Sequence, residues 1–124
     1  MGNDLISGIG IFIPVTDLEK STDWYRKMLG FEVLHRDAPK ANVLKIWNGI
    51  VVFCLVKSND IVQPEFPKNN YNVDHHMNFH TDDIHVIHQS LLEKGADIGD
   101  IHAFDGMKGF PLYDPDGNRF SVIE

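Results

Sequence analysis

The sequence predicts an α+β fold made of two βαβββ modules, and an internal repeat is the main reason. Two stretches share one pattern, in which a strand-like run leads into a Thr-Asp pair, a helical stretch and a glycine. The two glycines, Gly30 and Gly95, are 65 residues apart. Strand-like runs and turn signals follow each helical stretch. A repeat at this spacing indicates two similar units that pair. We expect them to form a curved, cup-like mixed sheet with one helix packed on each module.

The first module is predicted over residues 8–57. Residues 9–16 are β-branched and aromatic, which predicts a strand. A helix follows, with Asp17 as its N-cap and Gly30 as the left-handed residue that ends it. Helical spacing predicts that its core-facing residues are Leu18, Tyr25, Met28 and Leu29. Three more strands are predicted at 31–37, 41–47 and 50–56. Asn48-Gly49 joins the last two and is typical of a two-residue hairpin loop.

The second module is predicted over residues 75–124. It opens with a strand at 76–81 and continues with a helix whose apolar face holds Ile84, Ile87, His88, Leu91 and Leu92. Further strands are predicted near 98–103, 110–113 and 119–123, and residues 105–109 are predicted to be a mobile loop. Residues 58–74 contain prolines and asparagines without periodicity, which is typical of either a linker or a lid. We expect both modules to belong to one domain, residues 1–124.

The charge, the cysteine content and the apolar runs of the sequence limit which partners and which cellular location we expect. The 124 residues carry a formal net charge of −7, and the lysines and arginines are scattered, which argues against a nucleic-acid partner. Cys54 is the single cysteine, so no intrachain disulfide is possible. The N-terminus lacks the pattern of a signal peptide, and no apolar run reaches the ~18 residues that a membrane span needs. We therefore expect a cytoplasmic protein without a membrane partner.

Two motifs resemble those of the vicinal oxygen chelate superfamily. Val15–Ser21, followed by Trp24-Tyr25 and Leu29-Gly30-Phe31, resembles the first module of that superfamily. Tyr113–Phe120, which contains an Asp-Pro-Asp-Gly turn, resembles its second signature. The superfamily holds glyoxalases, bleomycin-resistance proteins, extradiol dioxygenases and fosfomycin-resistance enzymes. The resemblance implies the paired-module fold and a homodimer.

The resemblance also implies four metal-ligand positions, two in each module. In this sequence they match Gly10, Phe53, His76 and Ser121. Gly10 has no side chain, Phe53 has no donor atom, and a serine hydroxyl is a poor ligand for a divalent ion. A catalytic site usually needs three protein ligands. We therefore expect a member that lacks most metal ligands and uses no cofactor. Cys54 is the one good ligand near Phe53, but a shift of one residue would turn its side chain to the opposite face of the sheet, so the metal-free expectation holds in either register.

The predicted cup is apolar and aromatic with a few polar groups. Alternation along the strands predicts the ligand-binding residues Phe12, Phe53, His76, Asn78 and Ser121, with Arg119 beside them. Trp47 and Phe110 are expected at strand ends, where they would bind the ligand from the rim of the cup. Such a lining suits an organic molecule with a planar apolar part and one or two hydrogen-bonding groups. Two alternatives stay open. In the first, the aromatic residues fill the cup as a closed core and leave no room for a ligand. In the second, His76 has only a structural role and is held by a hydrogen bond to the backbone.

The leading hypothesis is a metal-free, small-molecule-binding protein similar in kind to bleomycin-resistance proteins. The alternative is a glyoxalase-like lyase, isomerase or dioxygenase, with His76 as general acid or base. A rearranged metal site would use His76, His80 and His102, or the pair His85 and His88. A third possibility is a filled cup whose role is assembly with a partner. No serine or cysteine lies in a recognisable nucleophile elbow, so the sequence does not predict covalent catalysis.

Overall fold

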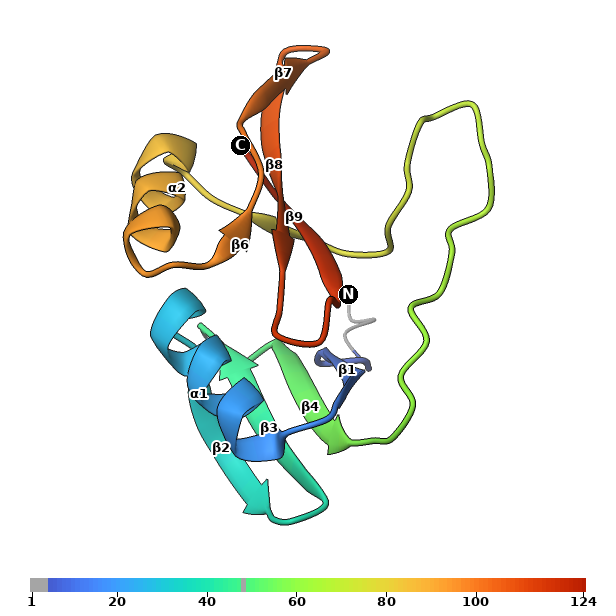
Figure 1. The fold of residues 1–124 in the computed structure, drawn as a ribbon, viewed down its shortest axis with the longest axis vertical. Coiled ribbons are helices and arrows are strands. Elements are labelled where there is room, and N and C mark those ends of the chain that lie inside the picture. Colours follow the sequence, from blue (N-terminus) through green and yellow to red (C-terminus); the bar gives the residue numbers. More distant parts are fainter. Residues whose placement is uncertain (1–4, 48) are drawn as a thin grey trace. The chain divides into compact units, whose positions relative to one another are not determined.

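The computed structural model describes residues 5–47 and 49–124. The chain forms two compact units, residues 1–61 and 62–124, and each consists of a sheet and one helix (Figure 1). The α+β class and the βαβββ modules are confirmed. The boundary between the units falls inside the predicted linker, and residues 62–74 belong to the second unit. The grouping of both modules into one domain stays a prediction.

The first unit is a four-stranded sheet with one helix. Its elements are β1 (Ile9–Val15), α1 (Leu18–Leu29), β2 (Glu32–Asp37), β3 (Ala41–Ile46) and β4 (Val51–Lys57). The strand order is β1-β4-β3-β2, in which β1 is parallel to β4 and the other pairs are antiparallel. Every predicted element is present. Gly49 has the positive φ of 82° that suits a hairpin turn, whereas Asn48 of the predicted Asn-Gly pair lies outside the described residues.

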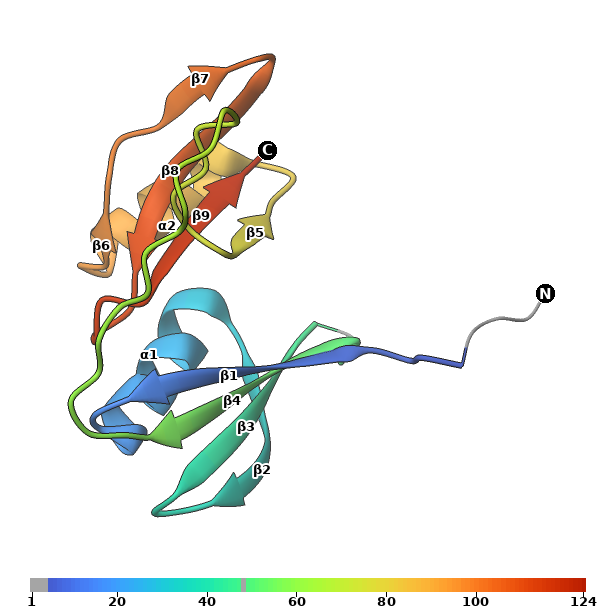
Figure 2. The same cartoon turned by 90° about the vertical axis from the view of Figure 1, so that its right-hand side faces the viewer.

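Helix α1 begins and ends where the sequence predicts. The Asp17 carboxylate accepts a hydrogen bond from the Lys20 backbone N at 3.1 Å, and Gly30 ends the helix with φ 73°. Tyr25 is fully buried, and its ring centroid is 5.9 Å from that of Phe53 on β4. The helix therefore covers one face of the sheet, which leaves the opposite face without a helix (Figure 2).

The second unit is a five-stranded sheet with one helix. Its elements are β5 (Asn78–His80), α2 (Ile84–Glu93), β6 (Asp97–Ile98), β7 (His102–Phe104), β8 (Met107–Tyr113) and β9 (Arg119–Ile123). The strand order is β5-β9-β8-β6, and β7 also pairs with β8. The predicted strand at 98–103 is thus two short strands. The predicted mobile loop at 105–109 was wrong, because residues 107–109 belong to β8. Only Asp105-Gly106 form a turn, with positive φ values of 48° and 76° that suit a tight hairpin.

Helix α2 begins after Asp83, whose carboxylate accepts a hydrogen bond from the Val86 backbone N at 3.2 Å. Ile84 and Leu91 are fully buried, but Leu92 is 54% exposed, so its predicted place on the core-facing side was wrong. Within residues 5–47 and 49–124, neither helix has the length and apolar character that crossing a membrane requires.

Candidate functional site

The helix-free face of the first sheet is apolar. Phe12 on β1 is 77% exposed, and its register partner on the parallel strand β4 is Cys54. Gly10 and Pro14 lie on the same face as Phe12, because side chains alternate along a strand. A Cβ at Gly10 would meet the Val52 side chain at 3.5 Å, which is ordinary contact. Phe12 therefore lies on the helix-free face, and its role in ligand binding stays a prediction.

Phe53 lies on the opposite face, and its prediction as a ligand-binding residue was wrong. It is 2% exposed, and its ring lies 5.6 Å from that of Phe31 in an edge-to-face contact. Its register partner on β1 is Ile11 rather than Phe12. A shift of one residue turns a side chain to the other face of a sheet. Phe53 is therefore a core residue, and Cys54 is the β4 side chain that shares a face with Phe12.

The two aromatic residues predicted at the rim lie in different environments. Trp47 follows β3 and is 88% exposed. Phe110 is 2% exposed, and its ring lies edge-on to that of His88 on α2 at 4.8 Å. The prediction that Phe110 lines a rim was therefore wrong. Because β8 begins at Met107, Phe110 occupies an inner strand position that faces α2 instead of a strand end.

Polar side chains gather on the helix-free face of the second sheet. Asn78 on β5 and Ser121 on β9 are register partners, as their predicted common facing requires. The His80 Nε2 is 3.0 Å from the Asn78 Oδ1. The Arg119 guanidinium lies 5.6 Å from the Tyr113 ring centroid. This face offers hydroxyl, amide, imidazole and guanidinium groups.

The histidine that contacts Ser121 is His75 rather than His76. The His75 Nε2 is 2.6 Å from the Ser121 Oγ. His76 is exposed, and its ring lies 5.0 Å from that of Phe66. The predicted strand starts at His76, but β5 starts at Asn78, so strand alternation does not describe the two histidines. The Asp-His dipeptide before the strand was the available signal, and by itself it is weak.

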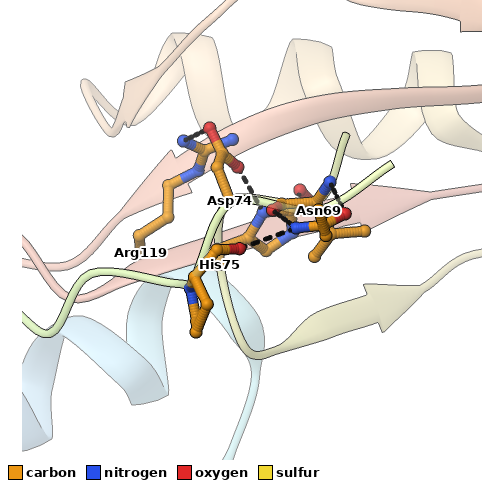
Figure 3. A network of polar contacts seen from close by, with 7 residues as sticks. Asn69, Asp74, His75 and Arg119 are labelled. Atoms are coloured by element: carbon orange, nitrogen blue, oxygen red, sulfur yellow. Dashed lines mark hydrogen bonds and ion pairs between the residues drawn. The ribbon is translucent and has the colours of Figure 1, made fainter. Parts of the chain in front are cut away.

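An ionised carboxylate completes this cluster. The His75 Nδ1 is 2.8 Å from one oxygen of Asp74, and the Arg119 Nη1 is 3.4 Å from the other (Figure 3). The hydrogen bond with His75 is the largest cause that lowers the pKa of Asp74 below its usual value. Burial opposes it, and the positive charge of Arg119 lowers the pKa further. Asp74 therefore orients the imidazole and stays charged near neutral pH.

The four family ligand positions do not fit a divalent metal ion. Gly10 has no donor, Phe53 faces the core, and the Ser121 hydroxyl already contacts His75. The side chain that replaces Phe53 on the helix-free face is a thiol, Cys54, which is a soft ligand. Within the described part of the chain, no three His, Cys, Asp or Glu side chains converge as a metal site would require.

A hollow of about 510 Å³ lies at the start of α1 in the first unit. Its lining residues are Thr16, Asp17, Leu18, Glu19, Ala38, Pro39 and Lys57. The Asp17 carboxylate there already caps the helix. None of the predicted site residues lines this hollow.

Comparison with known proteins gives a family and a set of similar folds. The sequence model of the Glyoxalase/Bleomycin resistance protein/Dioxygenase superfamily matches residues 9–122. None of the curated protein sequences matches the chain.

Three solved structures illustrate the similarity of fold. A lactoylglutathione lyase from Agrobacterium tumefaciens is 19% identical, with a TM-score of 0.72 over 95% of this chain and 93% of the other. A glyoxalase/bleomycin resistance protein from Streptomyces sp. CB03234 is 21% identical, with a TM-score of 0.72 over 95% and 100%. A glyoxalase family protein from Enterococcus faecalis is 24% identical, with a TM-score of 0.69 over 100% of both chains. At these identities the similarity establishes the fold alone.

Proposed function

Because the chain belongs to the Glyoxalase/Bleomycin resistance protein/Dioxygenase superfamily, we propose that it is a cytoplasmic, homodimeric protein that binds a small organic molecule without a metal ion. The observation that carries this proposal is the set of side chains at the family's ligand positions. Gly10, Phe53 and Ser121 cannot chelate a divalent ion together with His76. A member with these residues needs another means of holding its ligand.

The helix-free sheet faces supply that means. In the first unit, Phe12 presents most of its ring to solvent, and Cys54 lies beside it. A planar apolar group would stack on such a ring and remove it from water. In the second unit, Asn78, Ser121 and Arg119 offer donors and acceptors on one face. The face of the first unit suits a planar apolar group, and the face of the second unit, taken by itself, suits groups that form hydrogen bonds.

The exposed apolar side chains of the first unit support the homodimer. Ile9 is 58% exposed, Ile50 is 54% exposed, and the Ile9 backbone N donates to the Ile50 carbonyl at 2.9 Å, so the two lie side by side. Trp47 precedes the same hairpin. Exposed apolar residues that gather in this way are typical of surfaces that another protein or a ligand covers.

Phe12→Ala is expected to weaken ligand binding roughly 10- to 150-fold, since a buried phenylalanine ring contributes roughly 1.5–3 kcal/mol. Native mass spectrometry would measure this on EDTA-treated protein, using a panel of planar aromatic amines, alcohols and carboxylates. We expect a dimer that carries organic adducts, and loss of those adducts in the variant. Leu92→Ala is the matched control, because Leu92 is an exposed apolar residue on α2. A monomer without adducts, or equal binding by both variants, would contradict the proposal.

A further inference from the structure

Three side chains of the second unit lie in the order hydroxyl, imidazole, carboxylate. The Ser121 Oγ is 2.6 Å from the His75 Nε2, and the His75 Nδ1 is 2.8 Å from the Asp74 Oδ1. When the Nδ1–H donates to Asp74, the Nε2 lone pair accepts the proton of the Ser121 hydroxyl. A histidine in this tautomer acts as a general base towards serine. We propose that these three residues form a nucleophilic site that hydrolyses small carboxylic esters.

The backbone around this site is fixed by hydrogen bonds on both sides of the histidine–serine contact. The Asn69 Oδ1 accepts from the Tyr71 and Val73 backbone N atoms at 2.9 and 3.2 Å, and its Nδ2 donates to the Val73 carbonyl at 2.8 Å. Asn69 therefore shapes the segment that delivers Asp74 and His75 (Figure 3). This order favours catalysis, because a nucleophile and its base must keep their geometry.

Ser121 is fixed by the sheet. It lies inside β9, and its backbone N donates to the Met77 carbonyl at 3.2 Å. The hydroxyl is partly buried rather than sealed in the core, because Ser121 lies on the helix-free face beside Pro111 of β8. A reagent from solvent can therefore approach this hydroxyl, whereas Phe120 and Val122 on either side of it face the core.

Arg119 supplies positive charge to the same face. It lies two residues before Ser121 on β9, so both side chains project from one side of the sheet. Its Nη1 is 3.4 Å from Asp74, and its Nε is buried without a hydrogen-bond partner within the described residues. The positive charge of the guanidinium on this face favours the negative charge that develops during acyl transfer.

The reaction follows from the protonation states. The Ser121 Oγ forms a bond to the ester carbonyl carbon while its proton moves to the His75 Nε2. The tetrahedral intermediate then loses the alkoxide, which takes the proton from His75 as the carbon–oxygen bond to it breaks. Water attacks the acyl-serine in the same way, with His75 again as base. The products are a carboxylic acid and an alcohol, and no oxidant or reductant is needed. The proposal does not depend on metal-free ligand binding.

Labelling with diisopropyl fluorophosphate tests this proposal on the intact chain. Peptide mass mapping would compare Ser121 with Ser58, whose hydroxyl donates to the Val56 carbonyl at 2.9 Å instead of to a histidine. We expect Ser121 to react at least about 100-fold faster than Ser58, as general-base assistance gives. This comparison needs no variant. If the contacts only tie residues 74–76 to β9, Ser121 would react as slowly as Ser58, and the proposal would be overturned.

Two histidine variants test the role of His75. His75→Gln is expected to lower the labelling rate of Ser121 about 100-fold, and Asp74→Asn to lower it in the same direction. His35→Gln is expected to leave the rate unchanged, because His35 is an exposed residue of β2 in the first unit. Circular dichroism would verify that each variant is folded. Equal labelling rates in folded His75→Gln and His35→Gln variants would also overturn the proposal.

Discussion

Phe53→Ala is expected to lower the free energy of unfolding by about 3–5 kcal/mol, the range for truncating a buried aromatic side chain. The Phe53 ring lies within 6 Å, between ring centroids, of both Tyr25 on α1 and Phe31. Removing it leaves a cavity between the helix and the sheet, which the surrounding side chains cannot fill without shifting. Urea denaturation followed by circular dichroism measures the change.

The adjacent residue is the control for this prediction. Cys54 faces the helix-free side of the same strand and is partly exposed. Cys54→Ala is expected to cost less than about 1 kcal/mol, because little buried volume is lost. If Cys54→Ala proved as costly as Phe53→Ala, the register of β4 against β1 described above would be wrong.

Asp114→Ala is expected to lower the free energy of unfolding by about 3 kcal/mol, because it removes charge-assisted hydrogen bonds and leaves buried donors unpaired. Asp114 is 4% exposed, and its Oδ1 accepts from the Asp116 and Asn118 backbone N atoms, both at 2.9 Å. Its Oδ2 accepts from the Asn118 Nδ2 at 2.7 Å. The first aspartate of the Asp-Pro-Asp-Gly signature therefore holds the turn between β8 and β9.

A residue of the predicted linker (58–74) forms hydrogen bonds with the same turn. The Gln63 Nε2 donates to the Asp116 carbonyl at 3.1 Å and to the Asn118 Oδ1 at 3.3 Å. Thermal denaturation of Asp114→Ala would be compared with that of Asp100→Ala, which changes an exposed aspartate and is expected to shift stability by less than about 0.5 kcal/mol. Similar melting temperatures for the two variants would show that the signature does not stabilise the turn.

Local signals predicted the first module well. Asp17 and Gly30 mark the two ends of α1, because an N-cap and a left-handed C-terminal residue are chemical requirements of the helix itself. The second module was then predicted from its similarity in sequence pattern to the first. The Asp105-Gly106 turn was missed because the neighbouring strand β7 has only three residues, too few to show a period.

The site was predicted less completely than the fold. Phe53 was assigned to the wrong face because a shift of one residue in the register of β4 reverses which side chains point inwards. Phe110 was placed at a strand end because the predicted strand began three residues after the start of β8. His75 was overlooked because it lies just outside β5 and reaches Ser121, 46 residues later in the chain. Such a contact depends on the path of the chain before β5, and the pattern of apolar and polar residues does not predict the path of an irregular segment.

Metal content tests the central claim of metal-free binding most directly. The protein would be incubated separately with zinc, manganese, nickel and iron(II), dialysed, and analysed by inductively coupled plasma mass spectrometry. The residues at Gly10, Phe53 and Ser121 predict far less than one ion per chain under every condition. One tightly held ion per chain would contradict the account, because the ligands would then come from histidines and carboxylates that it assigns to other contacts.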